Sequence, residues 1–223
     1  MTNIQKRQLP GELFLLAGLI LNSLAISLMI KANFGISALD SLPYVLSLAF
    51  PVFKNGTWNA IIQSSWLIFT MVAIRKIKPG YLISFVLVFI FGLLLNSWAK
   101  VIQPLSNDFI FRLIYFAAGF LILAFGISFL MLCGTPVLPF DTVVRAFTTE
   151  KGMSLRKVRT GFDLFNLALS LAISLLFIGG IAGIGLGTLF SALLMGVVIH
   201  EITTRMSARL DIKPKIKLLG KLV

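Results

Sequence analysis

Six long apolar stretches constrain this chain more than any other feature of its sequence. A transmembrane helix needs about 20 predominantly apolar residues in succession. Stretches of about this length occupy residues 12–31, 58–74, 80–99, 110–132, 160–178 and 184–203. Only 13% of the residues are charged and 58% are hydrophobic, so the chain could not cover the surface of a water-soluble domain. The sequence therefore predicts an all-α polytopic membrane protein with six transmembrane helices, in a single domain over residues 1–223.

Two shorter apolar stretches remain, at residues 37–52 and 138–148, after the first and fourth spans. Stretches of this length more often re-enter the membrane or lie at its surface than cross it. We expect short re-entrant or interfacial helices at both places. The second stretch is equally compatible with an amphipathic helix on the inner surface, because Arg145 and Lys151 lie in or next to it.

The distribution of basic residues predicts the orientation of the chain. If the N-terminus is inside, 16 of the 20 Lys and Arg residues fall in inside segments and 4 fall outside. This bias agrees with the positive-inside rule and predicts cytoplasmic termini. It also explains the net charge of +12 without a nucleic-acid partner. A basic cytoplasmic tail at about residues 208–223 would attract the anionic head groups of the bilayer.

The chain also contains an internal repeat. Residues 18–41 resemble residues 119–142 at a constant shift of 101, which aligns Asp40 with Asp141, and sparser matches continue at a shift of 104. Each half then holds three spans and one short segment. Because three is odd, the second half must enter the membrane from the opposite side, so the halves form inverted-topology repeats.

The predicted repeats cover about residues 11–104 and 110–207. Inverted repeats are frequent in secondary transporters, whose binding sites lie between the halves and use discontinuous helices. They also occur in small scaffolding membrane proteins, so the repeat alone does not decide the function.

Two aspartates in apolar surroundings are candidate site residues, because ionisable residues within the membrane are costly. Asp40 is followed by Ser41, and Asp141 by Thr142, each at the start of a short helical stretch. In a structural interpretation both aspartates are helix N-caps. In a functional interpretation they form a cation or proton site on a substrate or ion pathway. The sequence leaves both interpretations open.

Arg159 and Asp163 form a second candidate pair. They are four residues apart at the start of the fifth span, so on a helix they share a face and can form an ion pair. The pair is either structural or a gate on the cytoplasmic side. Asn59 and Gln63 have the same spacing in the first half, but they are uncharged, so a charged gate would be asymmetric.

Three glycines spaced by four, Gly179, Gly183 and Gly187, indicate a small-residue face for close helix packing. We find no set of residues for nucleophilic catalysis and no metal-ligand cluster in the sequence, and therefore expect neither an enzyme nor a cofactor or metal site. The single cysteine, Cys133, is interpreted as a reduced, apolar residue.

These motifs resemble the YczE/YitT-type bacterial integral membrane proteins. The likeness covers about residues 11–207 and rests on four motifs: Gly134 with Pro139-Phe140-Asp141, Arg159 with Asp163, Gly179-Gly180, and Gly185-Leu186-Gly187-Thr188. The sequence departs from the pattern in having Asp163 where Glu is expected, and Leu39 where an aromatic residue is expected. The resemblance implies a bacterial inner-membrane protein of poorly defined function and supplies no substrate.

The sequence thus favours a small secondary transporter or exporter for an unknown small solute or ion, with its pathway between the two halves. The alternative is a non-transporting accessory protein that assists a partner in export or membrane-linked biosynthesis, as a homodimer or with another protein. A transporter requires a site that can be reached alternately from both sides, whereas an accessory protein requires an exposed partner face.

Overall fold

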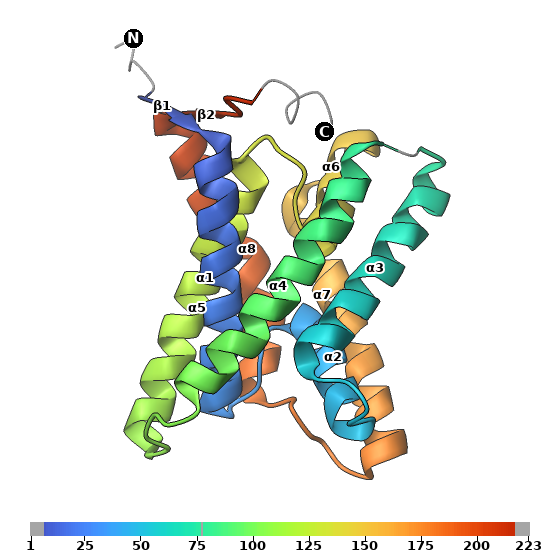
Figure 1. Cartoon of the computed structure of the whole chain (residues 1–223), viewed down its shortest axis with the longest axis vertical. Coiled ribbons are helices and arrows are strands. Elements are labelled where there is room, and N and C mark those ends of the chain that lie inside the picture. The colour runs from blue at the N-terminus through green and yellow to red at the C-terminus, as the bar shows by residue number, and fades with distance from the viewer. Residues whose placement is uncertain (1–6, 77, 217–223) are drawn as a thin grey trace.

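Six helices of the described residues are long and apolar enough to cross a membrane, as the sequence predicts. The structure is a computed structural model that describes residues 7–76 and 78–216. The candidate spans are α1 (Gly11–Ala32), α3 (Asn55–Ile74), α4 (Gly80–Ile102), α5 (Phe109–Leu132), α7 (Leu155–Ile173) with its π-helical continuation η1 (Ser174–Ile178), and α8 (Leu186–Arg209). Figure 1 shows them packed into one bundle. The ranges predicted from hydropathy omit polar turns at the ends of helices, such as residues 155–159 of α7. These turns are helical, but they lie outside the apolar stretch.

The two shorter apolar stretches form α2 (Ala38–Ala49) and α6 (Pro139–Glu150), of 12 residues each. At 1.5 Å per residue, such a helix is roughly 18 Å long, too short for a hydrocarbon core of about 30 Å. Most residues of both helices are buried. Helix α2 packs against α3 and α7, and α6 packs against the same two helices. The two short helices therefore lie within the bundle, in different halves of its height (Figure 1).

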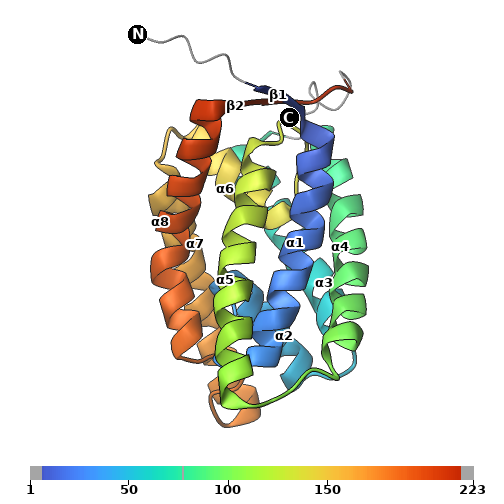
Figure 2. The same cartoon turned by 90° about the vertical axis from the view of Figure 1, so that its left-hand side faces the viewer.

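The centre of the bundle is the packing of α1 against α5, the most extensive helix contact in the molecule. Helix α4 flanks α1 and helix α8 flanks α5, as Figure 2 shows. Two glycines allow the close approach. A Cβ atom on Gly18 would lie 3.0 Å from the Gly126 carbonyl oxygen, and one on Gly119 would lie 2.9 Å from the Ala25 carbonyl oxygen. Small residues at such positions let helices approach closely in a membrane.

The two ends of the described chain meet on one face of the bundle, which we call the terminal face. Strand β1 (Arg7–Pro10) pairs in parallel with β2 (Leu210–Lys213), with Arg7 opposite Leu210. The Glu12 carboxylate accepts hydrogen bonds from the backbone N–H groups of Lys215 (3.1 Å) and Ile216 (2.7 Å). This strand pair was not predicted from the sequence, because the C-terminal tail is rich in basic residues and lacks the alternation of apolar and polar residues that indicates a strand.

Large apolar side chains are exposed on the outer surface of the bundle, including Leu82 (74%), Leu176 (78%) and Leu186 (88%). In contrast, many Asn, Ser, Thr and charged side chains are buried in the interior. This arrangement suits a chain surrounded by lipid, in which polar groups must find partners inside the protein.

We expect Gly119→Leu to destabilise the bundle, because the larger side chain would overlap with the backbone of α1 and with Met29. Overpacking of this kind costs about 1–3 kcal/mol. Thermal unfolding in detergent should show the loss as a lower midpoint. The matched control is Gly161→Leu on α7, where an added Cβ meets nothing within 4 Å. Equal stability of the two variants would contradict the proposed role of the α1–α5 contact.

Candidate functional site

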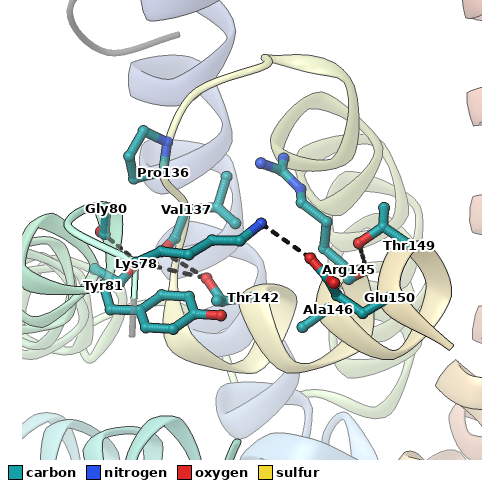
Figure 3. A pocket seen from close by; sticks show the side chains of 11 residues that line it. Lys78, Gly80, Tyr81, Pro136, Val137, Thr142, Arg145, Ala146, Thr149 and Glu150 are labelled. Atoms are coloured by element: carbon teal, nitrogen blue, oxygen red, sulfur yellow. Dashed lines mark hydrogen bonds and ion pairs between the residues drawn. The ribbon is translucent and has the colours of Figure 1, made fainter. Parts of the chain in front are cut away.

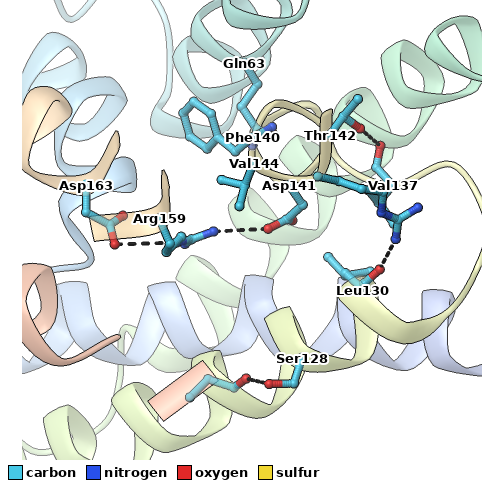
Figure 4. A network of polar contacts seen from close by, with 12 residues as sticks. Gln63, Ser128, Leu130, Val137, Phe140, Asp141, Thr142, Val144, Arg159 and Asp163 are labelled. Carbon is cyan, nitrogen blue, oxygen red and sulfur yellow. Dashed lines mark hydrogen bonds and ion pairs between the residues drawn. The ribbon is translucent and has the colours of Figure 1, made fainter. Parts of the chain in front are cut away.

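A charged cluster lies at the centre of the bundle, where α6 meets α7. The Arg159 Nη1 atom is 3.2 Å from Asp141 Oδ1, and its Nε atom is 3.5 Å from Asp163 Oδ2. All three side chains are almost fully buried. Figure 4 shows Arg159 reaching between the two carboxylates. Arg159 and Asp163 thus pair as their spacing predicts, and Asp141 is a second carboxylate partner that the spacing could not reveal.

A polar chain from α2 through α3 approaches the same centre. Asn59 Nδ2 donates to Asp40 Oδ1 (3.3 Å), and Gln63 Nε2 donates to Asn59 Oδ1 (2.6 Å). The Gln63 Oε1 atom accepts from the backbone N–H of Phe140 at the start of α6 (3.3 Å). Asn59 and Gln63 therefore link the first turns of α2 and α6.

A small cavity of about 20 Å³ lies between these groups, and its lining includes Asn22, Asp40, Asp141 and Arg159. About 10–15 Å³ is enough for one water molecule. The Asn22 Oδ1 and Asp163 Oδ1 atoms are buried without a hydrogen-bond partner. The site therefore has unused acceptors for a proton or a small polar ligand.

Asp40 and Asp141 are not the helix N-caps of the structural interpretation. Each is the third residue of its helix, and the N-cap positions are taken by Ser37 and Leu138. Neither N-cap residue makes a side-chain capping bond. Because helix N-termini favour negative charge, both carboxylates still lie in a suitable first turn. Their side chains are free to face the cluster because they do not cap the helix.

Ser41 and Thr142, the neighbours of these aspartates, bond on opposite sides of the centre. Ser41 Oγ lies 2.7 Å from Ser170 Oγ on α7. Thr142 Oγ1 donates to the Val137 carbonyl oxygen (3.2 Å). Both residues are buried, and each extends the site along its own short helix.

The three glycines do not form a face of one helix. Gly179 and Gly183 lie before α8 with φ angles of 75° and 69°, and only Gly187 is in the helix. An added Cβ at Gly179 meets nothing within 4 Å, whereas one at Gly183 would lie 2.6 Å from the Tyr44 ring. Gly183 therefore packs inside this chain, and the small-residue spacing reflects a turn followed by a helix start.

A pocket of about 240 Å³ opens near the terminal face, between the start of α4 and helix α6 (Figure 3). Its lining includes Lys78, Tyr81, Thr142, Arg145 and Glu150. Thr142 connects the pocket to the central cluster, because it directly follows Asp141. Lys78 and Glu150 were not predicted as site residues, because charged residues next to loops are usually exposed to solvent.

Arg145 does not point freely into solvent from a surface helix. Its guanidinium donates to the carbonyl oxygens of Leu130 (2.5 Å) and Thr135 (2.7 Å), which satisfies the end of α5. Carbonyl groups at a helix C-terminus lack partners within the helix. Arg145 thus holds α6 against the end of α5.

Two lysines hold Glu150 at the mouth of the pocket. Lys76 Nζ lies 2.5 Å from Glu150 Oε2, and Lys78 Nζ lies 3.3 Å from Oε1. The hydrogen bonds from Lys76 and Lys78 hold the pKa of the Glu150 carboxyl below its ordinary value. The ion pairs are therefore present at neutral pH and are lost as the pH falls through this lowered pKa.

Taken together, six candidate spans around a buried charged centre define a polytopic integral membrane protein. The chain belongs to the family of unknown function DUF6198, whose model matches residues 9–204. This membership agrees with the resemblance to YczE-type proteins seen in the sequence.

Two relatives from Bacillus subtilis (strain 168) match most of the chain. The uncharacterized membrane protein YczE is 29% identical over 191 residues, covering 84% of this chain and 82% of YczE. The uncharacterized protein YyaS is 28% identical over 188 residues, covering 82% of this chain and 87% of YyaS. No solved structure matches the chain. The matched relatives support a membrane protein and name no substrate.

We expect Arg159→Gln to destabilise the protein strongly, because it leaves Asp141 and Asp163 without their cationic partner. Breaking a buried ion pair costs about 3–5 kcal/mol. The double variant Arg159→Gln/Asp141→Asn should recover part of this loss in denaturant unfolding. As a control, Arg205→Gln removes the exposed i,i+4 pair with Glu201 and should change stability by about 0.5 kcal/mol or less. A double variant no more stable than the single one would count against the pairing.

The pKa of Glu150 offers a separate test. The chain has three glutamates, so isotope labelling of Glu gives a simple NMR titration. Glu150 should titrate below the ordinary range, and the double variant Lys76→Gln/Lys78→Gln should return its pKa toward that range. The control is Arg205→Gln, which removes a cation from the exposed pair with Glu201 and should leave the Glu150 titration unchanged. An unchanged Glu150 pKa would show that the lysines do not set it.

Proposed function

We propose that this protein is a small secondary transporter whose pathway runs through the central cluster, between two inverted repeats. The observation that carries the proposal is the burial of Arg159 with three carboxylates, where two short helices begin within the bundle. Ionisable residues at this depth mark substrate and ion pathways in membrane proteins. Short helices that start within the bundle are typical of transporter sites.

Helix packing supports the inverted repeats. Gly18 contacts the backbone of Gly126, and Gly119 contacts the backbone of Ala25, so both contacts follow the shift of 101. The contacts between whole helices also repeat. The packing of α1 against α4 corresponds to that of α5 against α8, and the packing of α2 against α7 corresponds to that of α6 against α3. Since α1 descends from the terminal face and α5 ascends to it in Figure 1, the equivalent helices run in opposite directions.

The two ends of the proposed pathway differ. Near the terminal face, the pocket beside Arg145 approaches Thr142. At the equivalent position on the other half, the shift of 101 aligns Arg145 with Tyr44, whose ring packs against Gly183. This difference supports a pathway that opens beside α6, whereas the Tyr44 ring fills the equivalent position beside α2.

We further propose that the terminal face is cytoplasmic, in the inner membrane of a bacterium. The support is the excess of Lys and Arg in the segments that end at this face. In this proposal the protein moves its substrate without changing it chemically. The accessory function is less favoured, because it needs an exposed partner face, and Gly183 of the predicted small-residue face packs against Tyr44 of the same chain.

The test is accessibility from each side of the membrane. In a Cys133→Ser background, single cysteines replace Ser41 and Thr142, which keeps every charge of the cluster. An impermeant thiol reagent is then applied to vesicles of both orientations. Cysteines at Asn107 and Met153, in loops at opposite ends of the bundle, control for sidedness.

We expect position 142 to react readily from the terminal face, and at least one of the two inner positions to react from both sides. Each loop control should react from one side only. If position 142 reacts only from the terminal face and position 41 only from the opposite face, no alternating pathway exists, and the transport proposal fails.

A further inference from the structure

The buried cluster contains more negative than positive groups. Asp40, Asp141 and Asp163 are between 1% and 7% exposed, and Arg159 is the cation that pairs with two of them. If every group is ionised, these four residues carry a net charge of −2. Arg145 also acts on Asp141, although its guanidinium is bound by carbonyl oxygens of α5. Even with Arg145 included, a net negative charge remains in the interior.

The elements around the cluster supply polar but uncharged groups. Helix α1 contributes Asn22 and helix α3 contributes Asn59 and Gln63. On α8, the charged residues Glu201 and Arg205 are exposed and pair with each other. An uncompensated charge in a low-dielectric interior is energetically unfavourable, and a carboxylate commonly avoids this cost by taking up a proton.

The geometry favours a proton over a metal cation. The cavity has about the volume of one water molecule, and the Arg159 guanidinium lines it and would repel a cation. Among residues 7–76 and 78–216, no three His, Cys, Asp or Glu side chains lie close enough to hold a metal ion. Arg159 Nε faces Asp163 Oδ2 at 3.5 Å, so the two acceptors at the cluster that remain without any partner are Asp163 Oδ1 and Asn22 Oδ1. A protonated carboxyl group is the donor that such acceptors lack.

We propose that Asp40, Asp141 and Asp163 share at least one proton, and that this proton is the coupling ion of the transporter. The coupling role rests on the function proposed above. Asp40 belongs to α2 and Asp141 to α6, and Arg159 borders the cavity that both carboxylates line. In this structure Arg159 pairs with Asp141, and the amide group of Asn59 donates to Asp40.

The proton changes the partner of Arg159. With the proton on Asp40, that carboxyl group is neutral and Arg159 stays with Asp141. Transfer of the proton to Asp141 forms an O–H bond there and breaks the one on Asp40, so the negative charge moves to Asp40 and attracts Arg159 toward α2. The proton enters from water on one face and returns to water on the other, and no other bond changes.

Infrared spectroscopy of the full chain in lipid tests this directly, because a protonated carboxyl group has a C=O stretching band separate from that of a carboxylate. Labelling the five aspartates with ¹³C shifts the band only if an aspartate carries the proton. The wild-type protein should show this band at neutral pH and lose it at alkaline pH. Asp40→Asn, Asp141→Asn and Asp163→Asn should each alter the band, with its loss in at least one.

Asp108→Asn is the matched control, since Asp108 lies in the exposed loop before α5, and the band should not change. Absence of the band from the wild-type protein at mildly acidic and neutral pH overturns the proposal, even if no variant folds. A band that sodium chloride removes at constant pH overturns it too, because another cation then competes for the site. Cysteine accessibility reads the transport pathway separately. If the band titrates but each cysteine reacts from one side only, the aspartates share a proton, but the proposed transport fails and the coupling role fails with it.

Discussion

The burial of one guanidinium among three carboxylates is the interaction on which the arrangement of this protein depends. Arg159 holds α7 to α6 through Asp141, and the same charge acts on Asp40 of α2. Because a lone charge in a lipid-surrounded interior is so costly, these helices must meet at a defined depth. The amide side chains of Asn59 and Gln63 then connect the short helices through α3. The positions of both short helices follow from satisfying this one group.

The outer fold was predictable from the sequence, because hydropathy acts on each segment separately. All six spans were found in this way, and the Arg159–Asp163 pair followed from helical spacing alone. The third partner, Asp141, lies 18 residues away on another helix, where spacing carries no information. The repeat alignment placed Asp141 opposite Asp40, but alignment cannot show that both side chains face one cavity.

The errors at the site have a common physical origin. One of the two interpretations of Asp40 and Asp141 made them helix N-caps, although the helices begin two residues earlier. Likewise, Gly179 and Gly183 have the spacing of a helix face but lie in a turn with positive φ angles. In both cases a local pattern was judged without knowing where the helix starts. Tertiary packing sets that start, and one residue of shift changes the direction of every side chain.

The pairing of β1 with β2 has a consequence for how the chain is made. The two strands come from opposite ends of the described residues, so their pairing holds these two segments together. During synthesis, β1 leaves the ribosome before α1, but its partner β2 leaves it only after α8. The strand pair can therefore form only after all six candidate spans have been synthesised. A nascent chain that stops before residue 210 would insert its spans and still expose an unpaired strand.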